Sequence, residues 1–130
     1  MVRLLTRGAP AALLLALGLA AALPAAATGD PGRGKGVFAA QCAQCHSVAK
    51  GGPVIMGPTL FGIVGRPAGS IPGFAYSKAN KTSGITWTAD SLESYLPAPK
   101  TKIPGTKMNY NGLKNPAQVD DLIAYLETLK

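Results

Sequence analysis

The sequence has very few residues that carry reactive or metal-binding side chains. Its 130 residues include two cysteines and one histidine. All three lie within the five-residue segment Cys42-Ala43-Gln44-Cys45-His46. A chain of this length allows about one domain, which excludes a multidomain enzyme. The reactive chemistry of the protein is therefore concentrated in one short segment.

Acidic and aromatic residues are also scarce. Six Asp and Glu stand against 13 Lys and Arg, giving a formal net charge of +7, and there are three Phe, four Tyr and one Trp. No run of aromatic and basic residues is available to stack bases, so we do not expect nucleic acid as a partner. The basic excess instead favours partners with acidic surfaces.

The first 27 residues have the composition of an export signal. Arg3 and Arg7 precede an apolar run at positions 11–23, and three alanines occupy positions 25–27. This order is typical of a secretory signal peptide that is removed from the mature protein. We therefore expect a cleaved signal at residues 1–27 and a periplasmic domain at residues 28–130.

An uncleaved membrane anchor is the alternative interpretation of this segment. No charged residue lies between Arg7 and Asp30, a span just long enough to cross a bilayer. Pro24 argues against a continuous helix at that point. Without residues 1–27 the chain keeps 11 basic and 6 acidic residues, so the mature domain remains cationic.

Capping signals predict helices at both ends of the domain. Asp30-Pro31 is typical of an N-cap followed by proline at the first helical position, in a helix that approaches Cys42. Asn115-Pro116 repeats the signal before the last helix, where apolar residues recur at helical spacing. These two helices, one at each end of the domain, favour an all-α fold.

A shorter helix is expected between them. Thr88 predicts the cap of a helix over residues 89–96, which Pro97 and Pro99 would end. Residues 50–85 read as loop, because they contain many of the 16 glycines and 11 prolines and show no strand-like alternation. We therefore expect three main helices and long loops, held together by a group other than protein.

The cysteine pair and the following histidine predict covalent haem attachment. Two cysteines three residues apart place both sulfurs on one side of a helical turn, which suits thioether bonds to one haem edge. His46 then follows directly as an axial ligand of the iron. A thioredoxin-like dithiol would need a βαβ setting, a zinc site would need more ligands, and a disulfide across two residues would be strained.

The second axial ligand decides between electron transfer and ligand chemistry. Once Met1 is removed with the signal, Met56 and Met108 are the remaining candidates. Met56 follows His46 too closely for the chain to wrap to the opposite haem face, whereas Met108 lies in a loop between the second and third helices. We therefore expect Met108 as the ligand. The alternative is a five-coordinate haem protein that acts as a gas sensor or peroxidase.

The order of motifs from residue 30 to 130 resembles the class I c-type cytochromes, the mitochondrial cytochromes c and bacterial cytochromes c2. The segments that carry the resemblance are Cys42-Ala43-Gln44-Cys45-His46, Gly57-Pro58-Thr59-Leu60, Pro72-Gly73-Phe74-Ala75-Tyr76, Gly84-Ile85-Thr86-Trp87, 103–108 and Asp121-Leu122-Ile123-Ala124-Tyr125-Leu126. The resemblance implies the cytochrome c fold around one haem c, attached through Cys42 and Cys45. It also implies a soluble electron carrier rather than an enzyme.

The same resemblance assigns roles to residues around the haem. By similarity, the Pro58 carbonyl accepts a hydrogen bond from the His46 ring, and Gly34 and Phe38 meet the last helix near Leu122 and Tyr125. Four residues would surround the haem propionates: Arg66, Tyr76, Trp87 and Thr106.

Two further residues are placed by the resemblance on the methionine side. Tyr95 would lie near the Met108 sulfur, and Asn80 would join the same polar pocket. An apolar core position is the alternative for Tyr95, as it is for the single tryptophan.

Three positions depart from the family pattern. Tyr110 stands where phenylalanine is common, Gln41 stands where the mitochondrial proteins have lysine, and Pro97 shortens the second helix. The first two departures fall near the expected haem edge, and the docking of partners is therefore the least transferable property.

The expected partners are redox proteins with acidic docking surfaces. Positive charge for such docking comes from Lys35, Lys100, Lys102, Lys107 and Lys114. Suitable partners include a cytochrome bc1-type complex, a terminal oxidase, a photosynthetic reaction centre or a periplasmic dehydrogenase. We expect the protein to act as a monomer in brief, salt-sensitive encounters.

Overall fold

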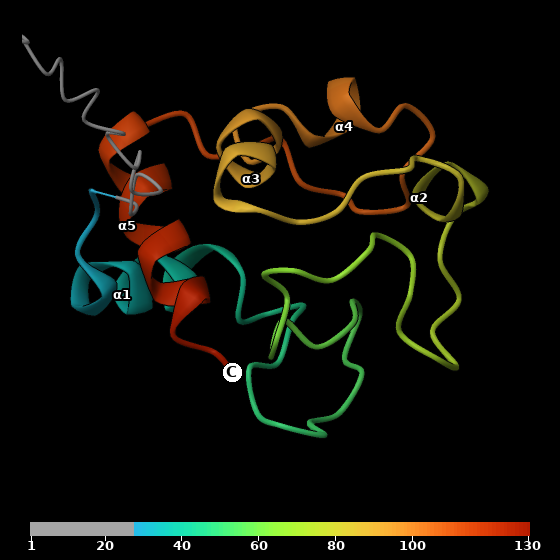
Figure 1. Cartoon of the computed structure of the whole chain (residues 1–130), viewed down its shortest axis with the longest axis horizontal. Helices are drawn as coiled ribbons and strands as arrows, with labels where there is room; N and C mark the ends of the chain where they lie inside the picture. Colours follow the sequence, from blue (N-terminus) through green and yellow to red (C-terminus); the bar gives the residue numbers. More distant parts are fainter. Residues whose placement is uncertain (1–27) are drawn as a thin grey trace, which may run out of the picture.

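The computed structural model describes residues 28–130, which form helices joined by long loops (Figure 1). The elements are α1 (Pro31–Gln41), α2 (Lys78–Lys81), α3 (Ala89–Tyr95), α4 (Pro99–Lys102) and α5 (Pro116–Glu127). The described part has no strand, and Pro67 and Thr86 form an isolated bridge. The all-α class is confirmed. The expected signal peptide lies outside the described residues.

The two long helices begin where their capping signals place them. The Asp30 side chain accepts a hydrogen bond from Arg33 N at 2.7 Å, with proline at the first position of α1. Asn115 accepts from Ala117 N at 3.0 Å at the start of α5. Each side chain satisfies a backbone donor that has no partner inside its helix. Local chemistry therefore fixes both starting points.

The middle helix α3 is also capped as expected, but its end differs. Thr88 and Ser91 exchange hydrogen bonds in a capping box, with Ser91 N donating at 3.1 Å and Thr88 N at 2.8 Å. The helix ends at Tyr95, one residue before the expected 89–96 boundary. Pro99 does not merely follow it, because it opens the one-turn helix α4. Proline suits a first helical position, where its missing N–H is not needed.

The expectation that residues 50–85 contain only loop was wrong at one place. Ser77 accepts a hydrogen bond from Asn80 N at 3.0 Å and caps the single turn of α2. Backbone hydrogen bonds tie the remaining loop to the segments just after α5 and just before α3. Gly62 N donates to Leu129 O at 2.7 Å, and Trp87 N donates to Arg66 O at 3.0 Å.

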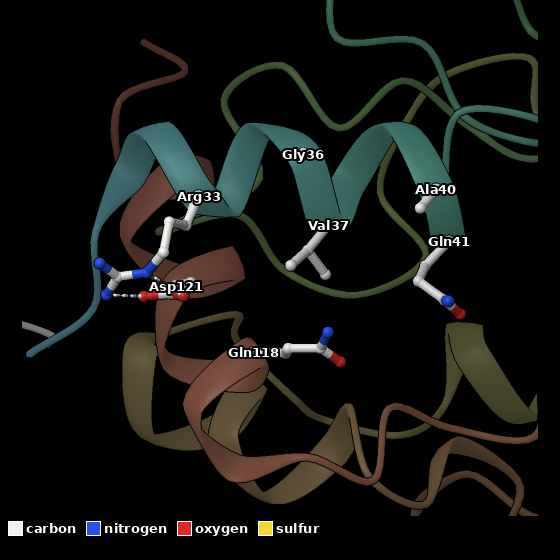
Figure 2. A pocket seen from close by; sticks show the side chains of 7 residues that line it. All are labelled: Arg33, Gly36, Val37, Ala40, Gln41, Gln118 and Asp121. Carbon is white, nitrogen blue, oxygen red and sulfur yellow. Dashed lines mark hydrogen bonds and ion pairs between the residues drawn. The ribbon is translucent and has the colours of Figure 1, made fainter.

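The helices α1 and α5 pack closely against each other, although they lie at opposite ends of the described chain (Figure 1). A Cβ at Gly34 would overlap the Asp121 carbonyl and lie 2.8 Å from the Tyr125 Cβ. The rings of Phe38 and Tyr125 lie 5.8 Å apart. At one end, the Arg33 guanidinium donates from Nε to Asp121 Oδ2 at 2.8 Å (Figure 2). The expected small-against-large contact between the two helices is present.

A single core joins these helices to α3 and the loops. Its buried side chains include Trp87 and Tyr95, whose rings lie 4.6 Å apart, and Leu122 of α5. No helix within residues 28–130 is long and apolar enough to cross a membrane.

Candidate functional site

The end of α1 delivers the Cys-x-x-Cys-His segment into a tight turn. Cys42 N donates to Phe38 O at 2.8 Å and completes the last turn of the helix. His46 N and Cys45 N then donate to the Cys42 carbonyl at 2.9 and 3.0 Å. The two thiols are half-buried and are not joined by a disulfide. The backbone therefore presents two sulfurs and one imidazole from a single turn.

His46 is oriented by the segment that follows it. Its Nδ1 lies 2.7 Å from the Pro58 carbonyl oxygen, so Nδ1–H donates to this acceptor and Nε2 keeps its lone pair. Burial lowers the pKa of His46, against a smaller opposing effect of the Pro58 carbonyl, and the positive charge of Arg66 lowers it further. The imidazole is therefore neutral, which is the form that binds a metal.

Gly57 packs directly against the imidazole. A Cβ at this position would lie 2.7 Å from Nδ1 and 3.0 Å from Nε2 of His46. These separations are shorter than a normal contact, so a side chain at position 57 would displace the ring. The glycine belongs to a segment singled out in the sequence, but its contact with His46 was not expected there.

The Cys42 thiol sits in an apolar setting. Burial raises the pKa of Cys42 to about 11, with a smaller contribution from the nearby Cys45. The thiol is therefore protonated at neutral pH. Because reactive catalytic cysteines usually have lowered pKa values, this direction does not support a thioredoxin-like role.

Met108 is held by its neighbours on α3 and in its own loop. The Tyr95 hydroxyl lies 3.8 Å from the Met108 sulfur, to which it donates. Met108 N donates to Thr106 Oγ1 at 3.2 Å. Asn80 Nδ2 donates to the same hydroxyl at 3.2 Å. This bond links α2 to residues 103–113, the segment that carries Met108 and is called the methionine loop below. The expected neighbours Tyr95 and Asn80 are thus gathered around Met108, and Thr106, which was expected at the haem propionates, joins them.

Met56 lies in a different environment. It is 72% exposed, and its sulfur lies 3.8 Å from Cys45 Sγ. Its backbone N donates to the Cys45 carbonyl at 3.2 Å. Met56 is therefore fixed on the segment that also supports His46, and that placement favours Met108 as the opposite ligand.

The residues expected at the haem propionates are arranged more loosely. Arg66 donates to the Phe61 carbonyl at 3.0 Å and the Thr59 carbonyl at 2.9 Å, and burial lowers its pKa. Tyr76 accepts from Ile71 N at 3.3 Å. Trp87 is 8% exposed and belongs to the core. The hydrogen bonds of Arg66 and Tyr76 go to other parts of the chain, so the role of these residues at the haem propionates is a proposal.

One contact near the site joins two positions that the sequence marked separately. Tyr110 O–H donates to Gln41 Oε1 at 3.3 Å. The residues are 69 positions apart, and no local pattern could have paired them. The contact brings the chain beyond Met108 to the end of α1.

The donor set fits a covalently attached haem. Two thiols without a disulfide and an imidazole whose Nδ1 donates to Pro58 are the groups that attachment and the first axial position require, and a half-buried thioether is available nearby. A Cβ at Gly57 would not fit beside the His46 ring, so packing as well as hydrogen bonding sets the orientation of the ring.

Comparison with known proteins identifies the family. The family model for cytochrome c matches residues 32–130, which is most of the chain. The chain belongs to the cytochrome c family. A cytochrome c2 of Blastochloris viridis is 50% identical over 109 residues, covering 84% of this chain and 85% of that protein.

Other relatives come from both bacteria and eukaryotes. A cytochrome c of Theileria annulata is 54% identical over 99 residues, covering 76% of this chain and 85% of that protein. A cytochrome c2 of Rhodopila globiformis is 50% identical over 102 residues, covering 78% and 95%. The expected resemblance to class I c-type cytochromes is confirmed.

Membership of the cytochrome c family establishes the fold and the cofactor. The domain has the all-α cytochrome c fold and carries one covalently attached haem c, with Cys42 and Cys45 at the spacing for attachment. The protein is a monohaem electron-transfer protein, as the cytochromes c and c2 among its relatives are electron carriers.

Proposed function

We propose that this cytochrome shuttles single electrons with its iron held between His46 and Met108. The observation that carries the proposal is the placement of the two sulfurs. Met108 is half-buried beneath the Tyr95 hydroxyl, whereas Met56 is exposed and tied to Cys45. A thioether ligand favours ferrous iron relative to a second imidazole and so raises the reduction potential.

When bound, the haem supplies an iron that alternates between the ferric and ferrous states. The chain's part is to hold that iron's ligands still. Pro58 fixes the imidazole tautomer and Gly57 fixes the ring position. Tyr95 and Thr106 hold Met108 from its side chain and its backbone. Ligands that stay in place in both oxidation states favour electron transfer without bond breaking.

The surrounding polar residues complete the proposed site. Arg66, Tyr76, Trp87 and Thr106 are proposed to face the haem propionates, with Asn80 extending the polar group on the Met108 side. A five-coordinate gas sensor or peroxidase would need an open iron position, and the hydrogen bonds around Met108 favour the shuttle instead.

The proposed partners are acidic redox proteins. Five lysines on the expected docking segments are exposed: Lys35, Lys100, Lys102, Lys107 and Lys114. They would steer encounters with a cytochrome bc1-type complex, a terminal oxidase, a photosynthetic reaction centre or a periplasmic dehydrogenase. Electron-transfer rates with such a partner should fall as salt screens the attraction.

We also propose that the protein works in the periplasm as a soluble monomer after removal of residues 1–27. The basic start, apolar run and alanine-rich end of this segment support the proposal. The intact mass of the purified protein tests it, because a chain that begins near Thr28 is expected. A mass that includes residues 1–27 would show that the segment is kept as an anchor.

Absorption spectroscopy tests the axial ligand. The ferric holoprotein should show a sulfur-to-iron charge-transfer band, and Met108→Ala should remove it. Met56→Ala is the matched control and should leave the band unchanged. A native protein that lacks the band, or whose ferrous form binds carbon monoxide readily, would exclude the shuttle with Met108 ligation.

A further inference from the structure

Two segments that bear the proposed axial ligands are joined by one side-chain contact. Residues 41–58 carry the cysteine pair and His46, and residues 103–113 carry Met108. Among the hydrogen bonds of residues 28–130, the bond from Tyr110 O–H to Gln41 Oε1, at 3.3 Å, is the one that joins these two segments. It therefore spans the site from the end of α1 to the methionine loop.

We propose that the Gln41–Tyr110 hydrogen bond is a latch that keeps the methionine loop closed and limits how often Met108 leaves the iron. The proposal rests on Met108 ligation as proposed above. In this role Gln41 and Tyr110 are positioning residues, since they act on the iron through Met108. The hydrogen bond would thus limit the rate at which other ligands replace Met108 on the iron of this electron-transfer protein.

The position of Tyr110 suits a latch. Its ring is partly buried and packs against the core, while the hydroxyl reaches an exposed glutamine at the last position of α1. Figure 2 shows Gln41 at this end of the helix. The hydroxyl therefore stands close to the haem-attachment segment, since Gln41 directly precedes Cys42.

Other hydrogen bonds of the methionine loop join it to α4 and to the segment around Ala75, and not to α1. Lys107 Nζ donates to the Ala75 carbonyl at 3.2 Å, and Lys100 Nζ donates to Asn111 Oδ1 at 3.0 Å. Loss of the bond to Gln41 would leave these ties intact. The loop would then open away from α1 while it remained attached to α4 and the 70–77 segment.

Two glycines near the ends of the methionine loop mark the points about which the loop would turn as it opens. Gly105 and Gly112 have φ values of 91° and 98°, which disfavour other residues. Gly112 also packs against the Pro97 carbonyl, where a Cβ would overlap. Between these two points, Tyr110 provides the hydrogen bond to the opposite segment.

Ligand exchange in the ferric holoprotein tests the latch. Excess imidazole is added, and the loss of the sulfur-to-iron band gives a limiting rate set by departure of Met108. Tyr110→Phe and Gln41→Leu should each raise this rate roughly three- to tenfold, because each removes one ordinary hydrogen bond. The double variant should be no faster than either single variant, since both remove the same bond.

Two further variants separate a latch from general destabilisation. Gln41→Glu keeps an acceptor and should retain a limiting rate near that of the native protein. Gln118→Leu, an exposed glutamine on α5, is the matched control and should not change the rate. Amide hydrogen exchange should increase at residues 106–111 in Tyr110→Phe, which reports opening of the loop without relying on the iron.

The outcomes distinguish the latch from the function on which it rests. Unchanged rates in both single variants, with the native band present, would overturn the latch and leave Met108 ligation standing. Additive rates in the double variant would show that the two side chains act independently and would also overturn it. Absence of the band from the native protein would overturn Met108 ligation and the latch together.

Discussion

The imidazole of His46 is held by contacts of two kinds. The Pro58 carbonyl fixes which nitrogen carries the proton, whereas Gly57 fixes where the ring lies. The first contact is electrostatic and the second is steric. Neither alone would hold a neutral imidazole in one orientation with Nε2 free, and the adjacent positions of the two residues allow one short segment to do both.

A methyl group at position 57 should disturb this arrangement. In Gly57→Ala the new Cβ would meet Nδ1 of His46 at 2.7 Å, so the ring or the 57–58 backbone must shift. We expect a loss of about 1–3 kcal/mol in the free energy of unfolding of the holoprotein, measured with denaturant. The haem absorption spectrum should change as well.

Gly36→Ala is the control for this substitution. A Cβ at Gly36 meets nothing within 4 Å, and the residue lies inside α1. The change should therefore be neutral or stabilise the protein by about 0.5–1 kcal/mol through helix propensity. Equal stability of the native protein and Gly57→Ala would contradict the steric role of Gly57.

At the scale of elements, the pair α1 and α5 depends on a buried carboxylate. Asp121 is 6% exposed and accepts from Asp30 N at 2.7 Å, as well as from Arg33 Nε at 2.8 Å. The Arg33 hydrogen bond and then the Asp30 N–H hold the pKa of Asp121 below its ordinary value of 3.8. The carboxylate thus joins the start of α1 to the middle of α5.

This lowered pKa predicts a defined acid dependence of stability. A carboxylate whose pKa is lower in the folded protein stabilises it above the unfolded pKa, and the contribution is lost as pH falls through the folded pKa. Asp121→Asn should therefore lower the melting temperature at pH 7, and its difference from the native protein should narrow below about pH 4.

Asp120→Asn provides the control for the acid dependence. This neighbouring carboxylate is half-exposed on the same helix, and its replacement should change the melting temperature less. A deficit in Asp121→Asn that stayed constant from pH 7 to pH 3 would argue against an ionised Asp121 as the source of the stabilisation.

Local signals in the sequence were sufficient to predict the three main helices. Asp30, Thr88 and Asn115 act on backbone donors within three residues, so their caps do not depend on the rest of the fold. The single turns α2 and α4 were not predicted, because four residues cannot show helical periodicity. Pro99 was interpreted as a stop, although proline opens a helix equally well.

The candidate site was predictable for a different reason. The cysteine spacing needed for covalent haem attachment and the single histidine available as an axial ligand are both visible in the sequence. The hydrogen bond of His46 to Pro58 is implied by the family resemblance. The Gln41–Tyr110 contact was not predictable, since it joins side chains 69 positions apart that have no shared pattern. Likewise, Arg66 bonds to nearby carbonyls that a motif does not specify.

At the scale of the whole molecule, the cofactor should be required for folding. The helices other than α1 and α5 have 4 to 7 residues, which is too short to be stable alone. The long loop between residues 50 and 85 contains one such turn. We therefore expect a Cys42→Ala, Cys45→Ala variant without haem to lose most of its helical circular dichroism.

The native holoprotein in the same buffer is the reference for that measurement. Full helix content in the haem-free double variant would show that the packing of α1 against α5 suffices to order the domain. A partial signal confined to these two helices would still agree with the requirement for the cofactor, because the loops carrying Met108 and Arg66 would be unfolded.

The packing of the first helix on the last has a consequence for the order of assembly during synthesis. Gly34 and Phe38 contact Asp121 and Tyr125 of α5, which begins at residue 116. Until residues 116–127 have been made, α1 lacks the helix against which it packs. The pairing of α1 with α5 is therefore a late step in folding, because it needs residues from both ends of the domain.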